Sequence, residues 1–343
     1  MSDDVNLSLE DVRAIVLDIF STRGVSAAQT NALADVITAA ERDNCKSHGL
    51  FRVPGYVASV ESGKMNKTAD PKVRQLAPSV LQVDAQEGFA PLALHVGHKP
   101  LAELARAQGI AALGILNSLH FQAVWYEVEA LAQEGLVALA CVTASSSVAP
   151  AGGIKPLFGT NPMAFGWPRR DGPPLVFDQA ASASARGEIQ IHKRDGKPIP
   201  QGWAIDADGN PTTDPTAALA GAQLPFGGYK GSSIALMIEL LAGAMIGDIF
   251  SYEVSERDSK DGGPMSRGET IIAIDPARCL TGGNRDAQLA HAEGLFERIL
   301  AQDGTRLPSD RRYAARLQTP TSGVFVPRSL HDTLESLRNS GGQ

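Results

Sequence analysis

The amino-acid sequence predicts an α/β protein with a separate helical lobe. Over residues 8–45 the apolar side chains recur only with helical spacing, whereas from Pro78 onward strand-like apolar runs alternate with amphipathic helical stretches. The chain has 343 residues, of which 43% are hydrophobic, and this is enough to build the cores of two domains. We therefore expect a helical lobe over residues 1–78, joined by residues 304–343, and an α/β domain over residues 79–303.

The predicted lobe begins with a helical hairpin. Apolar residues from Leu9 to Phe20 have helical spacing, and the run ends at Gly24, a common helix stop. Ser26 and Gln29 stand where a capping box would start the second helix.

The remaining elements follow from local apolar runs and the turn residues between them. We predict strands at residues 110–116, 136–143, 161–167, 175–178 and 270–275, and helices at residues 124–133, 232–246, 286–301 and 330–337. The strand, helix and strand over residues 110–143 form a βαβ-like pattern. Residues 187–220, rich in Gly, Pro and Asp, should form loops with a short hairpin, and residues 252–266 a surface loop.

Charge and cysteine content exclude several classes of protein. The 31 Lys and Arg residues face 38 Asp and Glu residues, and a net charge of −7 argues against a nucleic-acid partner. Cys45, Cys141 and Cys279 form no CxxC pair, so we expect neither a disulfide framework nor a metal site.

The acidic first residues are unlike a secretory leader. The apolar stretch over residues 234–246 contains Glu239 and is interpreted as a core helix. We expect a cytoplasmic protein without a membrane partner.

Two glycine patterns bear on nucleotide binding. No GxGxxG motif follows a strand, so a standard Rossmann site is unsupported. The turn over residues 227–233 fails the P-loop spacing, but free N–H groups at a helix start together with Lys230 could bind an anion. A tight turn with a solvated lysine is the alternative.

Ser47, His48 and Arg52 form the strongest catalytic candidate. Arginine pairs bidentately with a carboxylate, and histidine ordinarily titrates near neutrality and can give or take a proton. If the segment is helical, His48 and Arg52 lie on one face at positions i and i+4. The alternative is an interfacial histidine beside a surface arginine. A serine hydrolase that uses Ser47 is disfavoured because no GxSxG elbow is present.

Four further segments carry polar side chains at places where ligands often bind. His120 follows a predicted buried strand, and Thr160 precedes Pro162 in a segment that breaks strand alternation. Glu188 ends a run of small residues and could orient an imidazole, and an Arg311-Arg312 pair could bind a phosphate. A half-buried histidine, an ordinary β-turn, a surface carboxylate and a solvated turn are the respective alternatives.

Taken in order, these segments resemble the type-2 malate/L-lactate dehydrogenase family. The resemblance runs from SHGLFRVPGY through LFGTNPMAF, FDQAASASARG and PFGGYKGSSIALMIELL to LPSDRRY, nearly the whole chain. Within that family, residues 120–125, with Val124 and Trp125, are similar to the Δ1-piperideine-2-carboxylate/Δ1-pyrroline-2-carboxylate reductases. The resemblance implies a non-Rossmann NAD(P)-binding fold with a mixed sheet, NADPH as cofactor and a homodimer. It also implies reduction of cyclic imino acids to L-pipecolate and L-proline, with the first lobe on the substrate side and NADPH bound by the α/β domain.

The resemblance also assigns roles to individual residues. It makes His48 the proton donor, supported by Ser47 and by Glu188, where the family carries an Asp. Arg52 and Thr160 would bind the substrate carboxylate. The cofactor would be held by His120, Phe121, Gln122, Ala123, Val124, Asp178, Gln179, Ala180, Tyr229, Lys230, Arg311 and Arg312. A 2-hydroxyacid dehydrogenase of malate, lactate or ureidoglycolate type, and a non-catalytic nucleotide-binding module, remain alternatives.

Overall fold

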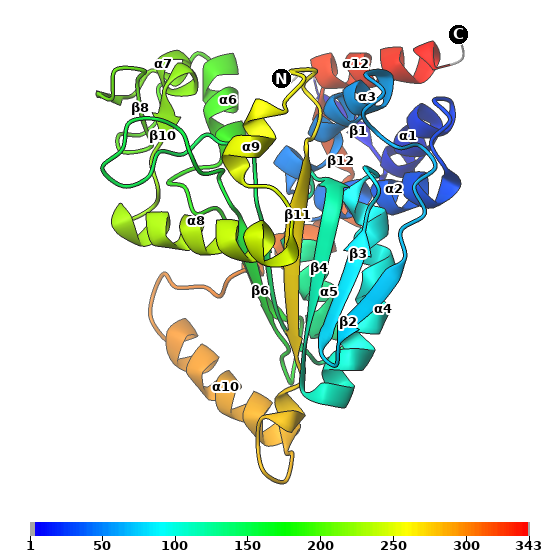
Figure 1. Ribbon diagram of the computed structural model, residues 1–343, viewed down its shortest axis with the longest axis vertical. Coiled ribbons are helices and arrows are strands. Elements are labelled where there is room, and N and C mark those ends of the chain that lie inside the picture. Colours follow the sequence, from blue (N-terminus) through cyan, green and yellow to red (C-terminus); the bar gives the residue numbers. More distant parts are fainter. Residues whose placement is uncertain (1–3, 342–343) are drawn as a thin grey trace.

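A seven-stranded mixed sheet forms the centre of the computed structural model, which describes residues 4–341 (Figure 1). In spatial order its strands are β2 (Val73–Ala77), β3 (Val80–Asp84), β4 (Ile110–Leu119), β11 (Ser266–Ile274), β5 (Val137–Val142), β6 (Met163–Trp167) and β7 (Leu175–Gln179). Only β3 and β4 pair in parallel, and the other neighbours are antiparallel. The α/β class and the mixed sheet are thus confirmed. The βαβ-like pattern is present as well, because β4 and β5 both run antiparallel to β11, which lies between them.

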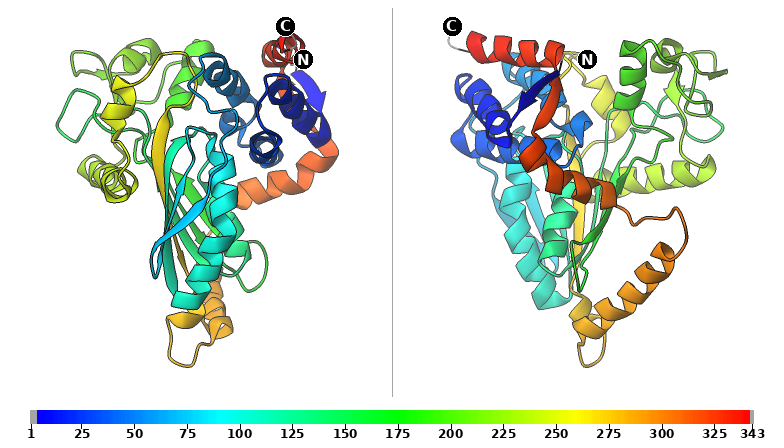
Figure 2. Two further views of the ribbon diagram at one scale, coloured as in Figure 1. Left: turned by 45° about the vertical axis from the view of Figure 1, so that its right-hand side comes forward. Right: turned by 180° about the vertical axis from the view of Figure 1, so that it is seen from behind.

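Helices cover both faces of this sheet. The helices α4 (Ala90–Gln108) and α5 (Trp125–Gln133) pack on one face, and α8 (Tyr229–Ala242) crosses the other, as the turned view in Figure 2 shows. Side chains on β11 alternate between these layers. Ile271 and Ala273 are buried in the core with α4 and α5, while the Thr270 hydroxyl donates to the Leu241 carbonyl of α8 at 2.7 Å.

The two ends of the chain build one helical layer beside the sheet. Its elements are β1 (Asp4–Leu7), α1 (Leu9–Ser21), α2 (Ala27–Arg42), the 3₁₀ turns η1 (Lys46–His48) and η2 (Leu50–Arg52), α3 (Val53–Glu61), β12 (Val324–Pro327) and α12 (Arg328–Ser340). Strand β1 pairs with β12, and Phe20, Tyr56 and Val326 share one buried apolar cluster. Residues 324–340 therefore join the N-terminal helices. The domain division at residue 78 stays a prediction, and β2, which precedes it, pairs with β3 of the large sheet.

The segment over residues 186–223 contains more regular structure than predicted. The expected hairpin is present as β8 (Ala204–Ile205) and β9 (Pro211–Thr212), which β10 (Ala222–Gln223) extends. The expectation of loops elsewhere is wrong, because α6 (Arg186–Arg194) and α7 (Pro215–Ala220) lie here. Helix α7 begins with Pro215 after Asp214, whose carboxylate accepts the Thr216 N–H at 2.9 Å. These two residues are ordinary helix-start signals that composition alone concealed.

Two other local predictions need correction, and a third is confirmed. Ser26 accepts the Gln29 N–H, but the Gln29 side chain bonds Asn66 and Phe89 instead of closing a capping box. The supposed loop over residues 252–266 begins inside a short helix, α9 (Ser251–Glu256). The predicted helix over residues 286–301 is confirmed as α10 (Arg285–Leu300).

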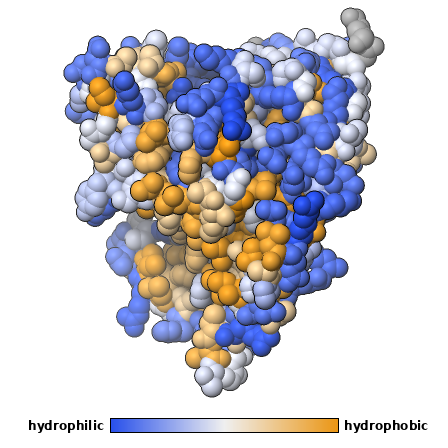
Figure 3. Space-filling model, in the orientation of Figure 1, coloured by the Kyte–Doolittle hydropathy of each residue, from blue (hydrophilic) through white to orange (hydrophobic). Residues whose placement is uncertain are grey.

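Helix α8 is a core helix on one face only. Ile238 and Ala242 are buried against the sheet, whereas Leu236, Met237 and Leu240 are exposed. Figure 3 shows an apolar area on this side of the molecule, over α8 and the neighbouring strands. Among residues 4–341, the segment Tyr229–Ile246, which continues α8 into η3 (Ala244–Ile246), is the one stretch that is long and apolar enough to cross a membrane by length and composition.

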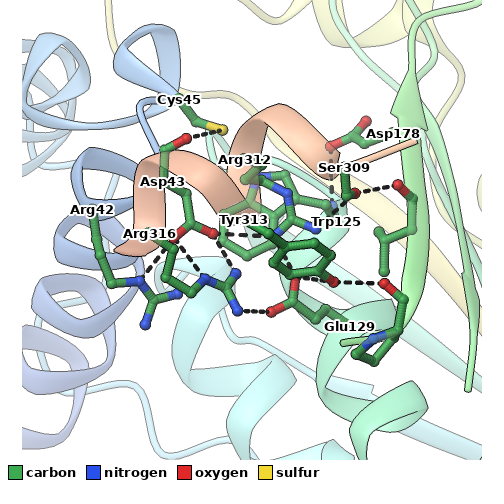
Figure 4. A network of polar contacts seen from close by, with 12 residues as sticks. Arg42, Asp43, Cys45, Trp125, Glu129, Asp178, Ser309, Arg312, Tyr313 and Arg316 are labelled. Carbon is green, nitrogen blue, oxygen red and sulfur yellow. Dashed lines mark hydrogen bonds and ion pairs between the residues drawn. The ribbon is translucent and has the colours of Figure 1, made fainter. Parts of the chain in front are cut away.

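A charged network ties the C-terminal helix α11 (Asp310–Ser322) to α2 and α5 (Figure 4). Asp43, at the end of α2, accepts from Arg316 Nε at 2.9 Å and from Arg312 Nη1 at 3.1 Å. Glu129 of α5 pairs with Arg316 Nη1 at 2.6 Å and also contacts Arg312. Burial alone would raise the pKa of Asp43, but hydrogen bonds from Arg316 and Arg42 outweigh it and lower the pKa. The side chain of Asp43 is fully buried, so the charged pairs are shielded from water.

We expect Asp43→Asn to reduce the free energy of unfolding by about 3–5 kcal/mol, because it removes one of the two buried carboxylates that balance the charges of Arg312 and Arg316. Urea denaturation measures the change. The exposed pair of Asp35 with Arg13 offers a control, and Asp35→Asn should cost only about 0–1 kcal/mol.

The difference between wild type and Asp43→Asn should also depend on pH. Since folding lowers the pKa of Asp43, its contribution is complete above the unfolded pKa of about 3.9 and is lost as the pH falls through the lower folded value. A difference that stayed constant in acid, or that matched the Asp35→Asn control, would contradict this role.

Candidate active site

A pocket of about 590 Å³ lies where the helical layer meets the edge of the sheet. Its wall comes from η1 and η2, the segment before α5, strand β7, the start of α6 and the start of α11. These segments are far apart in the sequence. The pocket brings together most of the predicted site residues, namely Ser47, His48, Arg52, Gln122, Ala123, Val124, Thr160, Asp178, Gln179, Ala180, Arg311 and Arg312.

The backbone around His48 depends on a close approach at Gly49. Glu41 Oε1 accepts the Leu50 N–H at 2.7 Å, and a Cβ atom on Gly49 would lie 2.1 Å from this oxygen. The chain therefore turns twice, in η1 and η2, in place of the single helix that we considered. His48 and Arg52 nevertheless both line the pocket.

The His48 ring is neutral at ordinary pH in the free protein. Burial, the positive charge of Arg52 and the proximity of His120 lower its pKa to about 3. The expectation that His48 titrates near neutrality is therefore wrong for the free protein. Ser47 Oγ lies 3.0 Å from His48 Nδ1, so the serine orients the ring through Nδ1, whereas a hydrolase serine would bond Nε2. His48 Nε2 forms no hydrogen bond with any residue in the range 4–341.

Arg52 is held in place by its surroundings. Its Nε donates to the Ser47 carbonyl at 2.6 Å, and its guanidinium lies over the Phe121 ring, 5.0 Å from the centroid. A Cβ atom on Gly187, in the first turn of α6, would stand 3.6 Å from Arg52 Nη2. Both Nη nitrogens remain without a partner among the described residues, so they can bind a planar carboxylate.

Asp178 joins the two predicted cofactor segments. Its carboxylate accepts the Trp125 N–H at 3.0 Å and thereby caps the start of α5 from strand β7. The surrounding protein removes the carboxylate in part from water and so raises the pKa of Asp178 to about 6, while hydrogen bonds from the backbone N–H groups of Trp125 and Val124 partly offset this rise. The residue itself is exposed to the solvent of the pocket. Residues 122–125 and 178–180 are consequently neighbours in the wall.

Five predicted residues are not part of the pocket lining, and three of them, Glu188, Tyr229 and Lys230, lie on α6 and α8. Glu188 of α6 is about half exposed, and its carboxylate faces His192 at 3.9 Å. It makes no contact with His48 in the part of the chain that the structure describes, so the expected acid relay is not formed. Tyr229 and Lys230 start α8 on the apolar side of the molecule, where Tyr229 is 69% exposed.

His120 and Phe121 lie behind the pocket wall. Phe121 packs edge-on against Tyr56 and supports Arg52. His120 is buried, and its Nε2 lies 3.4 Å from a carboxylate oxygen of Glu269. Together with Glu127 these two residues could hold a metal ion, although we predicted no metal site from the sequence.

The arginine pair near the C-terminus has two different roles. Residues 310–313 form the first turn of α11, so the alternative of a solvated turn is wrong here. Arg312 is buried and occupied: it pairs with Asp43 and Glu129 and lies 4.1 Å from the Trp125 ring centroid. Arg311 is exposed and pairs with no described acid.

The sequence reading missed other arginines of the pocket. Arg306 lines it beside Arg311 and is exposed without an acidic partner among residues 4–341. Arg186 lines it beside Gly187, and burial lowers its pKa. The sequence could have indicated Arg186, because this residue directly follows the run of small residues at positions 180–185.

Comparisons with known proteins find relatives of nearly the same length. The chain is 50% identical over 333 residues to the Δ1-pyrroline-2-carboxylate/Δ1-piperideine-2-carboxylate reductase of Pseudomonas aeruginosa, covering 97% of this chain and 99% of the relative. It is 41% identical over 330 residues to the (2R)-3-sulfolactate dehydrogenase (NADP+) of Chromohalobacter salexigens, covering 96% and 97% of the two chains.

A solved structure is similar over the same range. The Δ1-piperideine-2-carboxylate reductase of Pseudomonas syringae pv. tomato superimposes with a TM-score of 0.91 at 40% identity, covering 97% of this chain and 99% of that one. Residues 7–335 match the malate/L-lactate dehydrogenase family. Fold, site and sequence lead to one conclusion: the chain belongs to the malate/L-lactate dehydrogenase family.

Proposed function

We propose that the chain is an NADPH-dependent reductase of cyclic imino acids, converting Δ1-piperideine-2-carboxylate and Δ1-pyrroline-2-carboxylate into L-pipecolate and L-proline. Full-length similarity to reductases of this kind supports the reaction class. The observation that carries the choice of substrate is the 50% identity, over nearly the whole chain, to a reductase of both cyclic imino acids, and the pocket adds His48 beside an Arg52 that is free to bind a carboxylate.

Arg52 and Thr160 are proposed to bind the substrate carboxylate. The Arg52 guanidinium is fixed through Nε and through the Phe121 ring, so its planar fork is pre-oriented before substrate arrives. Thr160 lines the same pocket and can add a hydroxyl hydrogen bond. A carboxylate at Arg52 also cancels a positive charge that lowers the pKa of His48, so substrate binding should raise this pKa.

The state of His48 favours an imine over a ketone. Reduction of a ketone leaves an oxygen that needs a proton, and His48, whose pKa is lowered to about 3 in the free protein, can supply that proton only after a bound carboxylate has raised its pKa. A cyclic imine that binds already protonated at nitrogen needs no proton from the protein for reduction at C2. The neutral ring then only accepts a hydrogen bond from that nitrogen, while Ser47 fixes the ring through Nδ1.

The pocket fits a nicotinamide dinucleotide. Its volume lies within the range of small-molecule and cofactor sites, and its lining combines the Asp178 carboxylate and small side chains with two unpaired arginines, Arg306 and Arg311. Residues 122–124, residues 178–180 and Arg311 would hold the cofactor. When bound, NADPH supplies the hydride for C2 of the imine. Arg306 and Arg311 are proposed to bind the 2′-phosphate that distinguishes NADPH from NADH.

A homodimer is proposed from the exposed face of α8. Leu236, Met237 and Leu240 form an apolar area of a kind that a monomer rarely leaves open (Figure 3). A second copy would cover it. Light scattering should give the mass of two chains for wild type and of one chain for Leu240→Glu, and a monomeric wild type would refute the proposal. Cytoplasmic location stays a prediction from the sequence.

An assay with two substrate classes tests the proposed function. NADPH consumption is followed by its absorbance with each cyclic imino acid, and with a straight-chain 2-oxo acid of matched length. We expect kcat/KM for the imines to exceed that for the oxo acid by at least about 100-fold, a difference of about 2.7 kcal/mol in transition-state binding. A higher kcat/KM for the oxo acid would instead indicate a hydroxyacid dehydrogenase.

Replacement of Arg306 and Arg311 by alanine should erode the preference for NADPH over NADH. Each charged hydrogen bond to the 2′-phosphate contributes about 1.5–3 kcal/mol, so the ratio of kcat/KM values should fall by at least about tenfold. Arg298→Ala on α10, outside the pocket, is the matched control. An unchanged ratio in the double variant would place the phosphate elsewhere.

His48→Asn should affect the two substrate classes differently. With a 2-oxo acid, kcat should fall by about 10²–10⁴-fold, the usual contribution of general acid catalysis. With a cyclic imine the loss should be small in mild acid and should grow with rising pH, because protonated imine becomes scarce. The pH dependence of kcat for both substrates is the measurement.

Arg52→Lys should differ from His48→Asn. It should raise KM for the substrate, because lysine loses the bidentate contact with the carboxylate, and it should leave the shape of the pH profile of kcat unchanged. An ionisation of His48 near pH 6.5 in the free protein, measured by NMR of the imidazole, would contradict the neutral ring.

A further inference from the structure

A second cluster of polar side chains is buried behind the pocket wall. His120 follows β4, Glu127 lies in the first turn of α5, and Glu269 lies on β11. All three residues are buried, and one donor atom from each lies within 4.8 Å of the other two. The pocket does not use this cluster, because none of the three side chains lines it.

Most donor atoms of the cluster lack a hydrogen-bond partner. Both oxygens of Glu269, one oxygen of Glu127 and Nε2 of His120 are buried and form no hydrogen bond. Gln122 donates to the other Glu127 oxygen, while its own buried Oε1 also remains without a partner. Buried polar atoms are normally paired, so five such atoms in one place indicate a missing ligand.

Apart from His120 itself, no basic side chain in the described range of the chain forms an ion pair with the two carboxylates. Arg312 and Arg316 are occupied by Asp43 and Glu129, and Arg267 donates to the carbonyls of Met265 and Thr143. Burial, and then the nearby carboxylate of Glu269, raise the pKa of Glu127 well above its ordinary value. Two buried carboxylates need a positive partner or a proton.

The spacing of the donors fits a small divalent cation. His120 Nε2 and Glu269 Oε2 are 3.4 Å apart, and their contact does not meet the geometry of a hydrogen bond. Two ligands of a tetrahedral zinc ion, each about 2.0–2.1 Å from the metal, are about 3.3–3.4 Å apart. One imidazole and two carboxylates are also a donor set that Zn²⁺ accepts.

The cluster also borders a cavity through which an ion can reach it. A second cavity, of about 650 Å³, lies between α2, α4 and α5, and Gln122 and Glu127 are part of its lining. Gln122 and Trp125 belong to both cavities, so they separate the cluster side from the active-site pocket. An ion could enter here without passing through the substrate site.

We propose that His120, Glu127 and Glu269 bind a divalent cation, with Zn²⁺ the best fit and the Gln122 amide oxygen or a water as the remaining ligand. The ion would join the end of β4 to α5 and β11. It would thereby hold residues 120–124, one side of the active-site pocket, in place. It has no part in the reduction itself.

Metal binding by untagged full-length protein tests the proposal without any assay of turnover. After treatment with a chelator, the wild type should take up about one Zn²⁺ per chain, and its melting temperature should rise by about 5 °C. Co²⁺ as a substitute should give the visible absorption bands of a tetrahedral site. Absence of these bands together with an unchanged melting temperature would overturn the proposal.

Variants identify the ligands. Glu127→Gln and Glu269→Gln should each weaken Zn²⁺ binding by more than about 100-fold, whereas Glu103→Gln, at an exposed position on α4, should leave it unchanged. If a variant does not fold, the wild-type Co²⁺ spectrum decides alone. A proton shared by the two carboxylates is the competing account. In that case Glu127→Gln would raise the melting temperature of protein that binds no Zn²⁺, and the proposal would be wrong.

Discussion

The four ion pairs that Arg312 and Arg316 form with Asp43 and Glu129 hold the pocket together. Asp43 ends α2, just before Ser47 and His48, and Glu129 lies one turn beyond Trp125 on α5 (Figure 4). Helix α11 reaches both acids and carries Arg311 at its start. Three walls of the pocket, which come from distant parts of the sequence, are therefore fixed relative to one another by one buried set of charges. Because the set is balanced and well hydrogen-bonded, it can be buried without leaving an isolated charge.

Much of the pocket could be predicted because its residues lie in short segments with local signals. The Ser47-His48 pair, Arg52, Thr160 and Asp178 were selected from the sequence, and all of them line one cavity. Glu188 was not placed correctly from the sequence, because its direction depends on where α6 starts and on the turn of that helix. The pKa of His48 could not be predicted from the sequence either, because it is set by the burial of the ring and by the nearby Arg52 and His120.

The fold shows the same division between local and tertiary information. Helices with strong apolar spacing or capping residues, such as α1 and α10, could be predicted within a few residues. Helix α5 begins within one residue of its predicted start, but the carboxylate that caps it, Asp178, comes from a strand 53 residues away, and no local pattern reports that contact. Glu127 and Glu269 are far apart in the sequence, where neither has a local signal. They become neighbours only because α5 packs on the sheet that contains β11. The sites that escape sequence reasoning are thus those assembled by long-range packing.

The most direct test of cyclic imine reduction follows the hydride itself. The protein is mixed with NADPH deuterated at the transferable position and with Δ1-piperideine-2-carboxylate, and the product is examined by mass spectrometry and NMR. Arg52, and a His48 that needs to donate no proton, predict L-pipecolate with a single deuterium at C2. Recovery of unlabelled product, or of label only in a hydroxyacid formed from the ring-opened oxo acid, would contradict a reaction at the C=N bond.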